Sequence, residues 1–284
     1  MTELLRHAFF HALTDAGKLF PVLLATYLAL EYLEQKAGGK TLDLIRKSGR
    51  LGPLVGALCG IFPQCGLAAA AANFYAARVI SAGTLLAVFL STSDDMLPVL
   101  IAGSAAPTLI VKILLLKAAV AFVAGLALDF CSRGIPLLKP QTVDVETLCR
   151  NEGCKCEEGI LSSALRHAVK ITLFVLVFAF LFNALTAAVG MSAFSRALAD
   201  PFVGPAAAGL IGLVPNCSAS VIITQLYLEK AVGFGVLAAG TLVGAGVGLL
   251  VLYRVNPRVK ENLLLTGILY VAGVAGGALL GLLS

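Results

Sequence analysis

The sequence contains few charged residues and no tryptophan. Only 13% of its 284 residues are Asp, Glu, Lys or Arg, against about 25% in a typical soluble domain. Hydrophobic residues make up 59%, and the mean hydropathy is +0.94. This scarcity of charge excludes a disordered chain, a nucleic-acid-binding domain and most soluble enzymes. The composition instead predicts an all-α integral membrane protein whose helices pack closely in lipid.

Motifs of the common enzyme classes are also missing. We find no phosphate-binding loop, no HExxH sequence and no Ser-His-Asp set. We therefore expect no enzymatic activity, no partner nucleic acid and no permanently bound cofactor, while the oligomeric state is left open. The seven cysteines are an odd number, which does not fit a secreted disulfide framework.

The apolar stretches vary in length, and several are too short to cross a membrane. They run at 19–35, 51–63, 66–80, 83–102, 107–130, 160–189, 203–214, 218–228, 233–253 and 262–283. A spanning helix needs about 20 apolar residues. The sequence therefore predicts about ten short or broken transmembrane helices. Three full spans and a re-entrant hairpin in each half are the alternative, because each half would again cross the membrane an odd number of times.

The two halves of the chain match without a gap when one is shifted by 152 positions. Gly52-Pro53 then falls on Gly204-Pro205, and Pro63-Gln64-Cys65 falls on Pro215-Asn216-Cys217. Chance matching of Ala and Gly is expected in such a composition, but matching of these pairs and triplets at one offset is not. We predict a first membrane repeat over 1–131, a cytoplasmic linker over 132–159 and a second membrane repeat over 160–284.

Charge in the loops predicts that the repeats have inverted topology. Loop 34–50 carries five Lys or Arg residues, whereas its equivalent 190–202 carries one. Loop 103–108 has none, whereas its equivalent 254–260 has three. Basic loops stay in the cytoplasm. The bias therefore reverses between the halves, and it places loop 34–50, the linker and loop 254–260 on the cytoplasmic side.

The two matching triplets are the first candidate site. Pro63 and Pro215 would break their helices, and broken backbone in lipid is tolerated only inside the protein or beside a cavity. Gln64 and Asn216 offer amide oxygens, and Cys65 and Cys217 offer soft thiolate ligands. Inverted repeats would bring both triplets near the midplane, where transporter sites lie. The alternative is a packing kink beside a small buried cysteine.

A run of polar residues, Ser91 to Asp95, interrupts the apolar stretch 83–102. A carboxylate at the bilayer centre costs at least about 2.5–3.5 kcal/mol, and such residues mark ion or proton pathways. We therefore predict ion binding by Ser91, Ser93, Asp94 and Asp95. A polar turn outside the membrane is the alternative.

At the equivalent place the second repeat has Gly244-Ala245-Gly246-Val247. Gly244 and Gly246 are predicted to break the helix there and to let the backbone approach a substrate.

Lysines and cysteines supply two further candidates. Lys117 lies deep in the stretch 107–130, where it could be a counter-ion to Asp94 or Asp95 or could extend to the interface, as we expect of Lys112. In the linker, Cys149, Cys154 and Cys156 stand within eight residues and would suit a soft or borderline metal. A reduced cluster without metal is the alternative there.

Several of these segments resemble a known family. They are Tyr27–Glu34, Phe62–Gly66, Asn73–Ile80, Leu90–Pro98 and Val214–Ala219. Over nearly its whole length the chain is similar to the ten-transmembrane heavy-metal exporters, an arsenic-efflux-permease-like family in which some members are labelled as manganese transporters. The resemblance implies a multi-pass permease in a prokaryotic cytoplasmic (inner) membrane, with the lipid bilayer and an inorganic ion as its partners.

Two functions of different classes remain open from the sequence. The first is a secondary transporter that exports a heavy-metal or metalloid ion in exchange for protons. The second is a membrane thiol-redox carrier in which Cys65 and Cys217 form a reversible disulfide; it leaves Asp94 and Asp95 unexplained. A structural subunit without transport is disfavoured because buried acids and broken helices are costly.

Overall fold

A computed structural model gives the arrangement of the chain. It describes residues 51–62, 65–93, 96–135, 203–214 and 218–282, with scattered positions among 13–28 and 164–177 and at 138, 198 and 200. The ordered elements of these main segments are all helical, in keeping with the expected all-α class. In chain order they are α3 (Gly52–Cys59), α4 (Cys65–Ala76), α5 (Ala82–Ser91), α6 (Met96–Ala102), α7 (Pro107–Cys131), the short 3-10 helix η2 (Ser132–Gly134), α11 (Gly204–Gly212), α12 (Ser218–Leu228), α13 (Phe234–Val243), α14 (Val247–Val255) and α15 (Val259–Leu282).

Some of these helices are long and apolar enough to cross a membrane. Within the described part of the chain there are four such stretches, of 21 to 25 residues: Ala82–Ala102, Pro107–Cys131, Phe234–Val255 and Val259–Leu282. This number fits a protein that crosses the membrane several times. The larger number of about ten crossings stays a prediction.

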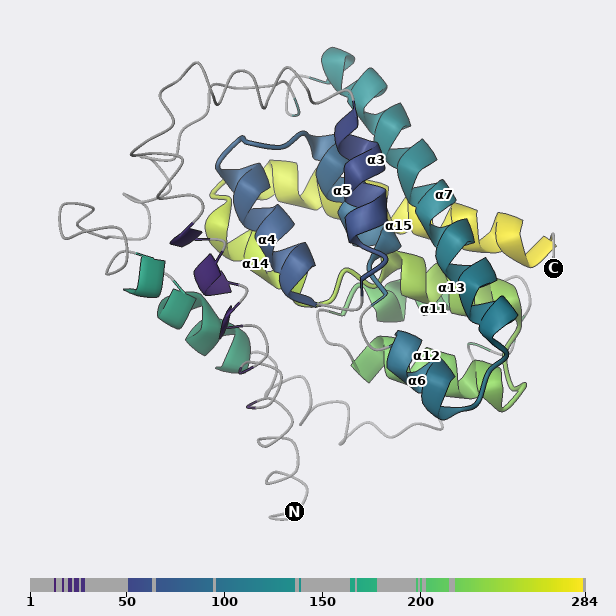
Figure 1. The fold of residues 1–284 in the computed structure, drawn as a ribbon. Helices are drawn as coiled ribbons and strands as arrows, with labels where there is room; N and C mark the ends of the chain where they lie inside the picture. The colour runs from purple at the N-terminus through teal and green to yellow at the C-terminus, as the bar shows by residue number, and fades with distance from the viewer. Residues whose placement is uncertain are drawn as a thin grey trace.

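The helices of the second half recur where the 152-residue offset places them. α5 and α13 coincide from first to last residue, and α3 and α7 begin where α11 and α15 begin. Equivalent helices also make equivalent contacts: α4 packs against α14, and α12 packs against α6 (Figure 1). Each half therefore contributes one helix to each of these two contacts. The inverted orientation of the halves stays a prediction.

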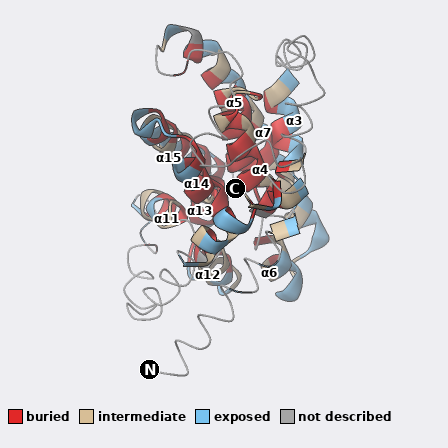
Figure 2. Cartoon of the chain, turned by 90° about the vertical axis from the view of Figure 1, so that its left-hand side faces the viewer, coloured by how far each residue is buried: buried red, intermediate tan, exposed pale blue. Residues whose placement is uncertain are grey.

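The interior is formed by the short helices, and the long ones surround it. Figure 2 shows α5 and α13 almost entirely buried, whereas α7 and α15 have extensive exposed surface. The exposed side chains of α7 include large apolar ones: Val111, Leu115, Val123, Leu126 and Phe130. A helix that is apolar on every side and still half exposed is suited to contact with lipid.

Glycines let the helices of each half approach closely. A Cβ atom at Gly125 of α7 would lie 2.5 Å from the carbonyl oxygen of Gly83 in α5. The equivalent pair in the second half, Gly277 of α15 and Gly235 of α13, is also close, with a Cβ at Gly235 only 3.2 Å from the Gly277 oxygen. Small residues at helix crossings are typical of membrane proteins, where packing drives association. The α5–α7 and α13–α15 pairs are therefore held at fixed spacing by backbone contact.

Candidate functional site

Two helices are interrupted at equivalent places in the centre of the molecule. α5 ends at Ser91 and α6 begins at Met96, while α13 ends at Val243 and α14 begins at Val247. Gly246 has φ 51° and ψ −135°, a backbone conformation that residues other than glycine avoid. The second interruption therefore lies where the sequence predicts it, at Gly244–Gly246. Helix ends at such a break expose carbonyls that need partners.

The side chain of Lys117 bridges the two interruptions. It extends from the middle of α7 and is only 1% exposed. Its Nζ donates hydrogen bonds to the main-chain oxygens of Thr92, at 2.6 Å, and of Thr241, at 2.9 Å. One oxygen belongs to the residue that caps α5, and the other to the last turn of α13. Lys117 thus joins a helix end from each half.

The position of this ammonium has an electrostatic reason. The last carbonyls of a helix carry partial negative charge, and a cation beside them is stabilised. Here a single cation lies against two helix ends at once. Lys112, on the same helix, is exposed. The buried position of the Lys117 ammonium does not match the alternative in which the side chain extends to the membrane interface. Its role as a counter-ion to Asp94 or Asp95 stays a prediction.

The hydroxyl residues before the predicted acids are buried and hydrogen-bonded to the backbone. Ser91, Thr92 and Ser93 are at most 4% exposed. Ser91 Oγ donates to the Ala87 oxygen at 2.7 Å, and Ser93 Oγ lies 3.0 Å from the Ser91 oxygen. Ser91 also lies at the contact with α3, where its Oγ is 3.4 Å from the Gly56 oxygen. A hydroxyl that donates to the backbone keeps lone pairs for a cation, so ion binding by Ser91 and Ser93 stays a prediction.

Many of the predicted ligands and helix breaks fall outside the described residues. This holds for Pro63, Gln64, Asp94, Asp95, Cys149, Cys154, Cys156, Pro215, Asn216 and Cys217. Cys65 is the first residue of α4, and only its backbone is described. Among the residues that the structure does describe, no three His, Cys, Asp or Glu side chains gather in a way that could hold a metal ion.

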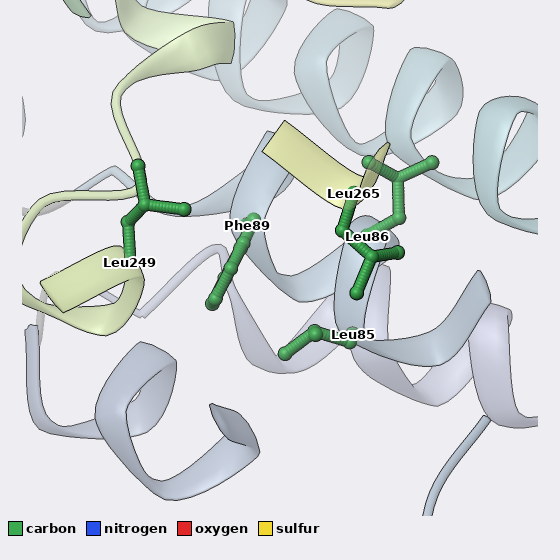
Figure 3. A pocket seen from close by; sticks show the side chains of 5 residues that line it. All are labelled: Leu85, Leu86, Phe89, Leu249 and Leu265. Carbon is green, nitrogen blue, oxygen red and sulfur yellow. The ribbon is translucent and has the colours of Figure 1, made fainter. Parts of the chain in front are cut away.

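A small pocket between the halves is entirely apolar. Leu85, Leu86 and Phe89 of α5 line it together with Leu249 of α14 and Leu265 of α15 (Figure 3). An apolar lining offers no ligand to an inorganic ion. The pocket is therefore a packing gap between the halves and not an ion site.

Sequence reasoning missed a buried ion pair that connects the two halves. Glu261, in the first turn of α15, is 1% exposed. Its carboxylate accepts hydrogen bonds from the Tyr75 hydroxyl and from the Arg78 guanidinium, whose Nη2 lies 3.0 Å from Oε2. Tyr75 is in α4 and Arg78 follows it in the turn before α5. A residue of the second half is thereby bound by two residues of the first.

Two asparagines extend this pair into a network. Asn256 Nδ2 donates to Asn262 Oδ1 at 2.7 Å, and Asn262 Nδ2 donates to the Asn256 main-chain oxygen at 2.9 Å. Arg78 Nη2 lies 3.4 Å from Asn256 Oδ1. Tyr75 and Arg78 belong to a segment that carries the family resemblance. Nothing in the sequence, however, joins them to residues about 180 positions away.

Comparison with known proteins agrees with the resemblance seen in the sequence. Residues 5–194 match the model of a family described as "putative, 10TM heavy-metal exporter". This match covers two thirds of the chain and ends before Pro215-Asn216-Cys217, so it is narrower than the likeness over nearly the whole length that we expected. No curated protein and no solved structure matches the chain. With its apolar spanning helices and its match over more than half of its length, the chain belongs to this family of ten-transmembrane heavy-metal exporters.

Proposed function

We propose that the protein is a secondary transporter that exports a heavy-metal or metalloid ion from a prokaryotic cell across the cytoplasmic (inner) membrane, in exchange for protons. The two halves would act as inverted repeats that expose a central site to one side of the membrane at a time. Such sites lie near the midplane and are formed by interrupted helices. The chain's two helix breaks at equivalent positions, near α7, fit this arrangement.

The observation that carries the proposal is the burial of Lys117 between the two interruptions. A cation inside a membrane protein is costly, and such residues by default mark ion or substrate pathways. The Lys117 ammonium lies against Thr92, two residues before Asp94. A fixed cation at this place would be the partner of those carboxylates when no substrate is bound. A metal ion that binds those carboxylates would then replace the ammonium as their partner.

The proposed ligands come from three chemical types. Asp94 and Asp95 supply carboxylates, with Ser91 and Ser93 beside them. Gln64 and Asn216 would add amide oxygens, and Cys65 and Cys217 would add thiolates. Carboxylate and amide oxygens suit Mn²⁺, whereas paired thiolates suit trivalent arsenic or thiophilic metals. The ligand set is therefore compatible with either an arsenic-type or a divalent-metal substrate.

Uptake into everted membrane vesicles tests this proposal. Mn²⁺, arsenite and methylarsenite would be supplied in parallel, with and without a protonophore. Asp94→Asn removes one proposed ligand charge without changing side-chain size. Glu229→Gln, which makes the same chemical change at an exposed residue after α12, is the matched control.

We expect one of the three ions to accumulate. Its accumulation should stop with the protonophore and in Asp94→Asn, and should persist in Glu229→Gln. The carboxylate mechanism would be rejected if none of the three ions accumulated, or if accumulation were unchanged in Asp94→Asn.

A further inference from the structure

The buried ion pair between the halves has no charged counterpart at the equivalent place. We define the Glu261 cluster as Tyr75, Arg78, Asn256, Glu261 and Asn262. At the 152-residue offset, Tyr75 and Arg78 correspond to Tyr227 and Lys230, so the first half's side of the contact is repeated. Asn256, Glu261 and Asn262 correspond to Ser104, Leu109 and Ile110, so the other side is not.

The backbone shows that the two places are equivalent in geometry. Arg78 and Lys230 both have positive φ, 60° and 58°, and both donate their main-chain N–H to the tyrosine three residues earlier. Lys230 is nevertheless exposed, and Tyr227 packs edge-on against Phe234, with ring centroids 6.2 Å apart. The same turn is therefore used for a buried ion pair in the first half and for an apolar contact in the second.

Glu261 lies one helical turn before a residue that lines the apolar pocket between the halves. Leu265, one turn after Glu261 in α15, lines that pocket together with Leu85 of α5 (Figure 3). Leu265 is 4% exposed. If Arg78 and Glu261 separated, the halves would lose the polar contacts that join Glu261 of α15 to the turn after α4. We expect water and small polar reagents to reach Leu265 more readily in that state.

We propose that the Glu261 cluster is the cytoplasmic gate of the transporter. This inference rests on the proposed function, because alternating access requires contacts between the halves to form and break at each end in turn. The adjacent loop 254–260 is basic and is predicted to face the cytoplasm, which assigns the cluster to that side. The structure is then the form closed to the cytoplasm. A buried charge that loses its partner is costly. When the cluster opens, Arg78 and Glu261 must therefore both become hydrated.

Labelling of a thiol one helical turn after Glu261 tests the proposal without a measurement of transport. The reporter is Leu265→Cys, because the tryptic peptide 261–284 contains no native cysteine and its labelling is read unambiguously by mass spectrometry. Labelling with a charged maleimide is timed in membrane fragments that are open to the reagent on both faces. The reporter is combined with Glu261→Gln, and separately with Lys230→Gln as the matched charge removal at the equivalent turn.

We expect Glu261→Gln to raise the labelling rate of the reporter thiol by about tenfold, because loss of the ion pair raises the population of a minor open state. Lys230→Gln should leave the rate unchanged. The exchanged pair Arg78→Glu with Glu261→Arg should return the rate toward that of the reporter alone. An unchanged rate in Glu261→Gln, or an equal rise in Lys230→Gln, would overturn the proposal.

A milder variant covers the case in which Glu261→Gln does not accumulate in membranes. Tyr75→Phe removes one hydrogen bond to Glu261 and leaves both charges in place, so it should raise the labelling rate by about fivefold at most. Labelling equal to that of the reporter alone would then count against the gate. If labelling responds as expected while no ion is exported, the gate survives and the export function fails. If export is found and labelling does not respond, the reverse holds.

Discussion

Lys117 and Glu261 are the two charged side chains that the described core encloses most completely, each being 1% exposed. Burial of an ionised group is costly unless it is paired or hydrogen-bonded. Each of them accordingly has more than one partner: Lys117 has two main-chain oxygens, and Glu261 has a hydroxyl and a guanidinium. In both cases the bonds join one half of the chain to the other, so both residues couple the halves.

Replacement of Lys117 by methionine should abolish export while leaving a folded protein. Methionine fills a similar volume but cannot donate to the oxygens of Thr92 and Thr241, and each buried acceptor left unpaired costs about 1–3 kcal/mol. We therefore expect vesicle accumulation to fall by more than about tenfold. Lys112→Met, five residues earlier on an exposed face of the same helix, is the control and should transport normally. Normal export by Lys117→Met would remove this residue from the mechanism.

Because only one of the two equivalent turns has an ion pair with Glu261, we expect alanine to lower the unfolding free energy by different amounts at Arg78 and at Lys230. Arg78→Ala leaves Glu261 buried with Arg258 at 3.8 Å as its remaining cationic partner, so we expect a loss of about 3 kcal/mol in unfolding free energy. Lys230→Ala places the same residue at a turn with the same positive φ, where no carboxylate corresponds to Glu261. Its cost should be about 0.5 kcal/mol or less, because Lys230 is exposed and its positive φ is as unfavourable for lysine as for alanine.

Unfolding of the two variants in detergent measures the difference. Because the backbone term is shared, the difference between the variants isolates the ion pair. Equal losses in Arg78→Ala and Lys230→Ala would show that the pair contributes nothing to stability.

At the scale of elements, short helices form the interior and long ones cover it. α5 and α13 are too short to cross a bilayer alone, and each continues into a second short helix after its break. They are held instead by α7 and α15 through glycine contacts. Interrupted helices are tolerated in lipid when neighbouring helices enclose the freed backbone groups, and here a side chain of α7 binds two of those groups directly.

Two glycines of α15 should respond in opposite ways to alanine. A Cβ at Gly277 would overlap the backbone of Ala239 in α13, whereas one at Gly267 would meet nothing within 4 Å. We expect Gly277→Ala to lower the unfolding free energy by about 1–3 kcal/mol, because the helices must separate. Gly267→Ala should raise it by up to about 1 kcal/mol, because alanine restricts the unfolded chain and favours helix. Thermal unfolding of both variants decides whether α13 and α15 are in backbone contact.

For the whole molecule, local patterns in the sequence predicted the elements well. The offset of 152 was visible from two Gly-Pro pairs and two triplets, and the helix bounds of the two halves follow it. The break at Gly244–Gly246 was predicted because glycine has a known local effect on a helix. Such features depend on residues close in sequence, so they need no knowledge of tertiary contacts.

The contacts between the halves could not be predicted in the same way. A lysine within an apolar helix is compatible with either an interior or an interfacial position, and α7 alone does not decide between them. The pairing of Arg78 with Glu261 joins residues 183 positions apart, and no periodicity marks it. Glu261 follows a basic loop, so its sequence context resembles an ordinary helix start with an acidic first turn.

The orientation of the two halves is a property of the whole molecule, and it gives the last prediction. Thr108 and Lys260 are equivalent at the 152-residue offset, and both are exposed near the start of a long helix, α7 or α15. If the halves are inverted, these two positions lie on opposite sides of the membrane, with Lys260 in the cytoplasm. If they are parallel, both lie on one side.

Thr108→Cys and Lys260→Cys separate these cases. The tryptic peptides that would carry the new thiols, 79–112 and 259–284, contain no native cysteine, so labelling of each is assigned by mass. With a membrane-impermeant maleimide we expect the thiol of Lys260→Cys to react in everted vesicles and that of Thr108→Cys in intact cells. Reaction of both from the same side would reject inverted repeats.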